Sequence, residues 1–245
     1  MVLLAHIRAG FSASRETYGS PRMTAELRAQ GIEVGRYRVA RIIPDNGLKA
    51  LQKRRFKKTT DSDHKGPVAP NILEQDFSAT GPDQKWGVDT SYIWTTEGWL
   101  YLAIVLDIYS RRIIGWATSE RLKQDLALTA LKRAIATCRP PRGVVHYSDR
   151  GSQYCAREYQ KILKAYGLIL SMKAKGNCYD NAMVETVFKT IKSEMVWRTI
   201  FQTRQQAQIA IGHYIEAFYN PKRRHSALGY KSPVQFEGQT CRLDA

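Results

Sequence analysis

Residues 86–106 read WGVDTSYIWTTEGWLYLAIVL, two apolar segments separated by a short polar turn. Side chains in residues 86–93 alternate with a period of two, as in a strand whose two faces differ. Residues 99–106 form a nearly continuous apolar run of strand length. The turn at 95–98 between them predicts that the two strands pair as a hairpin, with Trp94 opposite Trp99.

The chain that follows predicts further strands and helices. The expected elements are a strand at 111–117, a helix at 124–137, a strand at 143–147, a helix at 157–166, a strand at 168–172, and helices at 180–197 and 204–218. A three-stranded meander followed by helix, strand, helix, strand and helix is the order of an RNase H-like α/β domain. The sequence therefore predicts a five-stranded mixed sheet flanked by helices, within a catalytic core at residues 81–241.

The N-terminal segment is basic and helical in character. Residues 1–58 carry 13 Lys and Arg against four acids, a net charge of +9. A short helix after Pro21, a stop at Gly31 and a second helix after Gly35 suit a helix-turn-helix that faces DNA. A small helical cap with a solvated basic face is the alternative.

Three arginines, Arg36, Arg38 and Arg41, lie mostly away from the apolar side of the second helix and are candidate DNA contacts. Pro44 should end this helix near Ile43, because proline lacks an N–H and clashes with the preceding turn.

The stretch at 59–80 has linker composition, with prolines, a glycine and polar residues and no periodicity. The basic run KRRFKK at 53–58 precedes it. This run either follows a DNA backbone or is a solvated flank of the linker.

Charge favours a polyanionic partner. The chain has 38 Lys and Arg against 22 Asp and Glu, a net charge of +16, and such an excess favours nucleic acid through counterion release. A protein that is merely basic, or that binds anionic membrane, is the alternative. No run approaches the roughly 20 apolar residues of a membrane span. The four cysteines are widely spaced, so we expect free thiols in a reducing cytoplasm. With DNA as the expected partner, we expect the protein to be associated with the nucleoid.

Three carboxylates are candidates for a metal-dependent site. Asp89 lies within the first strand, and Asp149 lies at the end of the segment GVVHYSD, just after the strand at 143–147. Glu185 lies on the helix at 180–197, for which Asp180 or Asn181 is a candidate cap. Carboxylates from different elements are what a two-metal phosphodiester site requires. Each also has a structural alternative: a solvent-facing strand residue, a turn aspartate, and an ion pair between Glu185 and Lys189.

A fourth acid, Asp107, competes with Asp89. If Trp94 pairs with Trp99, Asp89 falls opposite Ile104, and Asp107 lies about 10 Å further along the second strand. We therefore assign Asp107 to the bend that follows.

These residues together resemble a known family. The chain is similar to the second-frame transposases of the IS-three family of bacterial insertion sequences, within the DDE transposase and retroviral integrase superfamily. The matching segments span about residues 18–236 and are YGSPRMTAELRAQGI, WGVDTSYIW, LAIVLDIYSRRIIGWA, HYSDRGSQY, GNCYDNAMVETVFKTIKSE and YNPKRRHSALGYKSPVQF.

The resemblance implies that Asp89, Asp149 and Glu185 hold two Mg²⁺ ions, for which Mn²⁺ can substitute. It implies strand cleavage by water, followed by attack of the new 3′-hydroxyl on a second phosphodiester. Lys189, Lys192 and Arg150 would contact the DNA. The expected partners are double-stranded DNA, further copies of the chain assembled on it, and a first-frame partner protein.

Family members usually begin several tens of residues upstream, so this chain is expected to be a late-start or truncated product. Two alternatives to the transposase therefore stay open. One is a DNA-binding protein of the same fold that does not catalyse, and the other is a nuclease that cuts without joining.

Overall fold

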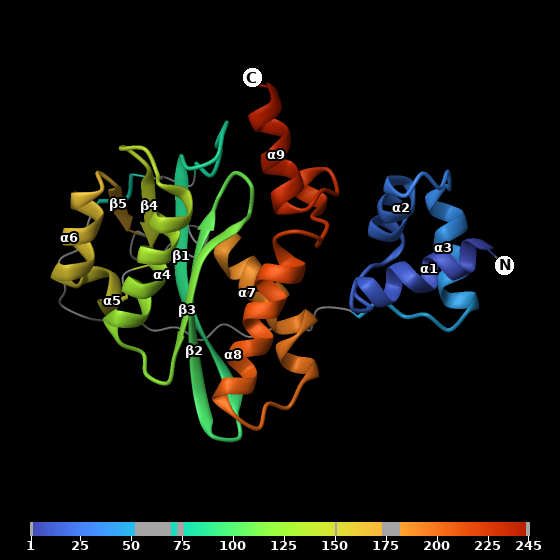
Figure 1. The fold of residues 1–245 in the computed structure, drawn as a ribbon, viewed down its shortest axis with the longest axis horizontal. Coiled ribbons are helices and arrows are strands. Elements are labelled where there is room, and N and C mark those ends of the chain that lie inside the picture. The colour runs from blue at the N-terminus through green and yellow to red at the C-terminus, as the bar shows by residue number, and fades with distance from the viewer. Residues whose placement is uncertain (1, 52–69, 73–75, 150, 173–181, 244–245) are drawn as a thin grey trace.

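The computed structural model describes residues 2–51, 70–72, 76–149, 151–172 and 182–243, with side chains up to residue 239. Figure 1 shows a small unit of three helices beside a larger α/β unit. The helices are α1 (Val2–Ala13), α2 (Ser20–Ala29), α3 (Arg36–Asp45), α4 (Gln124–Cys138), α5 (Ser152–Cys155), α6 (Arg157–Ala165), α7 (Ala182–Glu194), α8 (Arg204–His213) and α9 (Pro233–Leu243). The strands are β1 (Lys85–Thr95), β2 (Gly98–Asp107), β3 (Ile113–Ser119), β4 (Val145–Ser148) and β5 (Ile169–Met172).

The five strands form one mixed sheet in the order β3-β2-β1-β4-β5. β1, β2 and β3 pair antiparallel, whereas β4 is parallel to both β1 and β5. This confirms the predicted five-stranded mixed sheet. The predicted hairpin register is also confirmed, with Trp94 opposite Trp99 and Asp89 opposite Ile104.

A helical layer covers each face of the sheet (Figure 1). Trp86 and Val88 belong to the apolar core shared with α4, α5 and α6. Ile104 belongs to the second core, which α7 and α8 complete. Gly115 of β3 lets α4 approach closely, because a Cβ at this position would stand 2.3 Å from the carbonyl oxygen of Ala130.

The helical unit has its own core, with Ile7, Met23, Leu27 and Val39 fully buried between α1, α2 and α3. The turn from α2 to α3 has the predicted form. The expectation for Pro44 was wrong, because α3 continues through it to Asp45. Proline in the final turn removes only one helical hydrogen bond, and the next residues still close theirs on the carbonyls before them.

Several boundaries and elements differ from the prediction. The helix expected at 180–197 is described from Ala182, ends at Glu194, and is followed by a 3-10 turn at Val196–Arg198. The one expected at 204–218 changes after His213 into a π-helical turn, Tyr214–Tyr219. The short helices α5 and α9 and the 3-10 turn Ser226–Leu228 were not predicted. The basic run at 53–58, most of the expected linker, Arg150 and the expected cap residues Asp180 and Asn181 lie outside the described residues.

Part of the expected linker lies along β5. The backbone N–H of Met172 donates to the carbonyl of Pro70 (3.3 Å), and the N–H of Ile72 donates to Ser171 Oγ (2.9 Å). Cys138 and Cys155 are free thiols, as expected. In the described parts of the chain, no helix combines the length and apolar character needed to cross a membrane.

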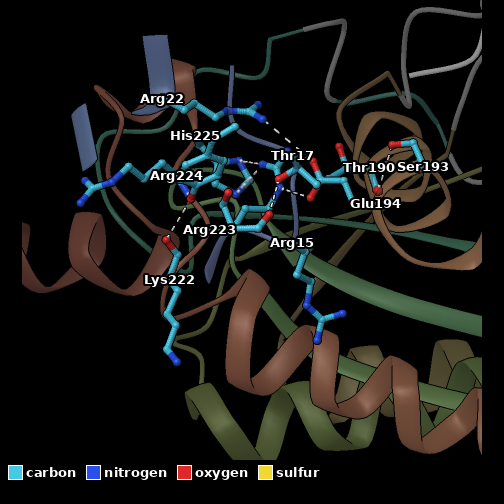
Figure 2. A network of polar contacts seen from close by, with 12 residues as sticks. Arg15, Thr17, Arg22, Thr190, Ser193, Glu194, Lys222, Arg223, Arg224 and His225 are labelled. Carbon is cyan, nitrogen blue, oxygen red and sulfur yellow. Dashed lines mark hydrogen bonds and ion pairs between the residues drawn. The ribbon is translucent and has the colours of Figure 1, made fainter. Parts of the chain in front are cut away.

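A buried ion pair closes the C-terminal half of the fold (Figure 2). Glu194, at the end of α7, accepts from Arg223 Nε (2.7 Å) and from Arg223 Nη2 (2.6 Å), and also from the Tyr214 hydroxyl (2.7 Å). The side chains of Glu194 and Arg223 are only 5% and 2% exposed. The pair therefore fixes the segment after the π-helical turn against α7.

The helical unit is docked on this same segment. Arg224 donates from its backbone N–H to the Tyr18 hydroxyl (2.7 Å) and from Nε to Glu26 Oε2 (2.6 Å). Arg198 Nη1 donates to the carbonyl of Arg15 (2.7 Å). The contacts that hold the helical unit thus come from the last third of the chain.

Replacing Glu194 by glutamine should lower the free energy of unfolding by about 3–5 kcal/mol, because it leaves the buried Arg223 guanidinium without its counter-charge. Urea denaturation measures this change. The matched control is Glu120→Gln, since the Glu120 side chain is 60% exposed in its ion pairs with Arg121 and Arg204. The control should change stability by less than about 1 kcal/mol. An equal effect of the two substitutions would contradict the assigned role of the buried pair.

The same pair predicts a pH dependence. Burial raises the pKa of Glu194, but Arg223 and Tyr214 lower it by more, so the pKa lies below its ordinary value. A carboxylate with a lowered pKa stabilises the fold above the unfolded pKa, about 4.3, and loses this contribution as the pH falls through the folded value. The stability difference between the wild type and Glu194→Gln should shrink as the pH is lowered from 6 to 3. A constant difference would contradict this assignment.

Candidate active site

Two of the three predicted carboxylates lie beyond the last backbone pair between the parallel strands β1 and β4, which is Gly87 with Tyr147. Asp89 lies two residues further along β1, and Asp149 is the residue that follows the end of β4 at Ser148. Side chains two residues apart on a strand share one face of the sheet. Asp89 therefore lies on the face of Gly87, which packs against Val184 of α7.

Tyr154 lies close enough to both aspartates to feel their charges. Its side chain is 1% exposed, and its hydroxyl lies 3.1 Å from Thr90 Oγ1, next to Asp89 on β1. Burial raises the pKa of Tyr154 well above its ordinary value, and the charges of Asp149 and Asp89 raise it further. The hydroxyl thus keeps its proton in the field of both carboxylates. The sequence reading missed this residue, although it lies in the HYSDRGSQY segment, five residues after Asp149.

Local hydrogen bonds orient each aspartate. Asp89 Oδ1 accepts from the backbone N–H of Thr90 (2.7 Å). Asp149 Oδ1 accepts from the N–H of Gly151 (2.8 Å), just before the short helix α5. Both side chains are partly exposed.

Helix α7 reaches this face because Gly87 has no side chain. A Cβ at Gly87 would stand 2.7 Å from Val184 Cγ2 and 3.0 Å from Ile108 Cδ1. The residue after Val184 is Glu185, the third predicted carboxylate. Gly87 therefore sets how closely the helix that carries Glu185 approaches the strand that carries Asp89.

Glu185 itself is not gathered with the aspartates. Its side chain is 43% exposed and lies 3.7 Å from Lys189 Nζ, one turn further along α7. Across the described residues, no three His, Cys, Asp or Glu side chains are close enough together to hold a metal ion. The structure thus places Asp89 on the sheet face over which the Glu185 helix packs, with Asp149 just after the neighbouring strand β4.

Lys192 lies on the same side of α7 as Glu185. Its Nζ is 4.7 Å from the centre of the Tyr92 ring, on the same strand as Asp89. Burial lowers the pKa of Lys192, and the nearby charge of Asp89 acts in the opposite direction. A lysine and an aromatic ring therefore flank the first aspartate.

Asp107 has a structural role, as the register argument indicated. It is 2% exposed, and its Oδ1 accepts from both the backbone N–H and the hydroxyl of Ser110, each at 2.7 Å. Its Oδ2 accepts from the N–H of Asp83 (2.9 Å). The bonds from Ser110 close the turn between β2 and β3, and the bond from Asp83 holds the residues before β1 against this turn.

The predicted DNA contacts of the helical unit lie on the outer side of α3. Val39 and Ile43 face the core, whereas Arg36, Arg38 and Arg41 are exposed. In the part of the chain that the structure describes, none of these three arginines forms an ion pair. Arg150, the remaining candidate, lies outside that part.

Comparison with known proteins places the chain in a family. Residues 2–56 match the family model of an HTH-like domain, and residues 79–178 and 185–241 match models of an integrase core domain. A 31 kDa protein of insertion element IS600 from Shigella sonnei is 48% identical over 96% of this chain and 85% of that protein. Transposase InsF for insertion sequence IS3A from Escherichia coli is 46% identical over 95% of this chain and 81% of that protein.

Solved structures show the same fold. The catalytic core domain of HTLV-2 integrase, solved in complex with magnesium, aligns with a TM-score of 0.52 and 15% identity over 65% of this chain and 99% of that one. A chain of the simian T-cell lymphotropic virus intasome aligns with a TM-score of 0.53 and 15% identity over 87% of this chain and 70% of that one. The sheet order, the integrase core matches and the insertion-sequence relatives lead to one conclusion: the chain belongs to the IS3 family of insertion-sequence transposases.

Proposed function

We propose that this chain is a DNA transposase that cuts the ends of its element and joins them to new DNA, with Asp89, Asp149 and Glu185 as its catalytic carboxylates. The observation that carries the proposal is the position of Asp89 on the sheet face against which the Glu185 helix packs, with Asp149 just after the neighbouring strand β4. Membership of the IS3 transposase family supports it.

The donor set fits hard divalent cations. Carboxylate oxygens are the ligands that Mg²⁺ and its substitute Mn²⁺ take in proteins. Asp89 and Asp149 would hold the metal from the sheet and Glu185 from α7. A pair of such ions activates an attacking oxygen and stabilises a leaving one in phosphodiester chemistry.

The chain's own residues would prepare the site. Tyr154 keeps its proton and ties the α5 segment to β1 through Thr90, which supports the relative position of the two aspartates. Lys192 lies where its ammonium can contact a DNA phosphate next to Asp89.

Glu185 would join the aspartates by exchanging its partner. Its ion pair with Lys189 is largely exposed, and exposed pairs contribute only about 0–1 kcal/mol. A DNA phosphate beside Lys189 would offer the ammonium a new partner and free the carboxylate for the metal. In this proposal the catalytic set is completed when DNA is bound.

DNA recognition is assigned to the exposed arginines of α3, whose place on a short second helix after a tight turn suits entry into a groove. We also infer that the chain assembles on DNA as an oligomer, with the first-frame protein as a further partner, in the cytoplasm where the chromosome lies. Relatives described as transposases support these assignments.

One observation favours a second candidate. The Glu185 carboxylate is paired with Lys189 and lies apart from the aspartates. A DNA-binding protein that keeps the fold without cutting would have the same arrangement. Measuring DNA cleavage and joining by the wild type and by variants of the candidate carboxylates separates the two candidates.

Glu185→Gln should reduce cleavage and joining of an element-end duplex by at least about 100-fold, because even the partners of metal ligands contribute about 10–100-fold. DNA affinity should stay within about twofold. The assay is gel analysis of labelled DNA with Mg²⁺ and with Mn²⁺. Glu120→Gln, which removes an exposed acid elsewhere, serves as the control. Equal activity of the two variants would refute the assignment of Glu185, and no activity in the wild type would favour the second candidate.

Gly87→Ala should move α7 away from β1, because the new methyl group would meet Val184. We expect a loss of cleavage of about 10-fold or more, since small displacements of catalytic groups are costly, while DNA affinity is retained. Gly238→Ala is the matched control, because open space surrounds a Cβ there. If Gly87→Ala cleaves at the wild-type rate, close packing of α7 is not required for catalysis.

Arg38→Ala should weaken DNA binding without affecting cleavage at saturating DNA. A lost phosphate contact should also reduce the slope of log affinity against log salt by about one. Fluorescence anisotropy at several salt concentrations measures both effects. Arg121→Ala removes an exposed arginine of the α/β unit as a control. Unchanged affinity and slope for Arg38→Ala would exclude α3 from the DNA interface.

A further inference from the structure

A pocket of about 130 Å³ lies between the helical unit and the α/β unit, beside α7. It has room for a group of several atoms. Three arginines from distant segments line it: Arg22 from α2, Arg111 from the turn between β2 and β3, and Arg223 from the segment after the π-helical turn. Figure 2 shows Arg22 and Arg223 pointing toward Glu194 from different elements.

The pocket has an excess of positive charge. Glu194 is bound by Arg223 through two hydrogen bonds, and Arg22 Nη1 reaches it only at 4.0 Å. Arg111 forms no hydrogen bond or ion pair with any other residue that the structure describes. Burial lowers the pKa of Arg22, and repulsion from Arg223 lowers it further. Glu194 thus pairs with Arg223 and approaches Arg22, whereas Arg111 has no carboxylate partner among the described residues.

A buried hydroxyl in the same wall has no partner. Tyr219 is fully buried and lines the pocket, and its hydroxyl forms no hydrogen bond within the described chain. Leaving such a group unsatisfied is unfavourable, and native proteins rarely do so without a functional reason. Its pKa is raised by burial, so the hydroxyl remains a donor. Among the described residues, the Tyr219 hydroxyl in the wall of the pocket therefore lacks an acceptor.

The arginines of the pocket suit an oxyanion. Guanidinium groups bind phosphate oxygens with paired hydrogen bonds. We propose that this pocket binds a phosphate group of the DNA backbone. The choice of DNA as the source rests on the proposed function of the chain.

The pocket's place on α7 indicates which phosphate it takes. Thr186 and Thr190 line the pocket, whereas Glu185, Lys189 and Lys192 lie on another side of the same helix. A helix with its side chains is about 10 Å wide, and successive nucleotides of one strand rise by about 3.4 Å. The bound phosphate is therefore a different one from the phosphate that reacts, and the pocket anchors the flanking DNA.

The first experiment measures inorganic phosphate binding by calorimetry, without DNA or divalent metal. Wild-type protein should bind phosphate, and Tyr219→Phe should bind it about 10-fold more weakly, as expected for a hydrogen bond to a charged group. The melting temperature of Tyr219→Phe should be unchanged or higher, because the variant removes an unpaired hydroxyl. Equal phosphate affinity in the two proteins would overturn the proposal.

The second experiment measures affinity for duplex DNA, again without divalent metal. Arg111→Gln and Tyr219→Phe should each weaken binding about 10-fold, and Arg111→Gln should lower the salt slope by about one. Arg139→Gln is the matched control, because Arg139 has a similar positive φ (50° against 58°) and follows α4 on the opposite face of the sheet. Weaker phosphate binding with unchanged DNA affinity would overturn DNA as the source of the phosphate. Neither readout depends on cleavage, so the test of the pocket can fail or succeed independently of the catalytic proposal.

Discussion

The buried pair of Glu194 and Arg223 is the contact on which the arrangement of the units depends. Glu194 ends the helix that packs over Gly87, and Arg223 belongs to the segment that holds the helical unit through Tyr18 and Glu26. Taking two charges out of water is costly unless their hydrogen bonds are met, and here both carboxylate oxygens are bound. The same pair therefore connects the sheet face that carries α7 to the helical unit.

The two halves of the candidate site differ in how they are fixed. Asp89 is set by backbone register, because it is paired with Ile104 of β2, and Asp149 directly follows the end of β4. Glu185 depends instead on side-chain packing of α7 and on an exposed ion pair with Lys189. A sheet register changes only in whole steps, whereas an exposed ion pair rearranges at little cost. The aspartates thus form the rigid part of the site and Glu185 the adjustable part.

This difference also explains what the sequence could predict. Alternation in residues 86–93, together with the 95–98 turn, was enough to place Asp89 opposite Ile104 and to separate it from Asp107. The strand that precedes Asp149 was also predicted, and its observed end at Ser148 differs by one residue. The approach of α7 over Gly87, the role of Tyr154 and the arginine-lined pocket arise from contacts between residues far apart in the chain, which no local pattern encodes. The end of α3 was misjudged because a proline in a last turn removes only one hydrogen bond.

The docking of the helical unit has a consequence for how the chain is made. Glu26 and its partner Arg224 are separated by 198 positions. Synthesis proceeds at about 5–20 residues per second, so roughly 10–40 s pass between the appearance of the two side chains. The helical unit has its own core and can fold early in this interval. Its surface for the α/β unit then stays in water until the last segment arrives. A nascent chain therefore exposes a folded helical unit, with the arginines of α3 on its surface, before its α/β unit is complete.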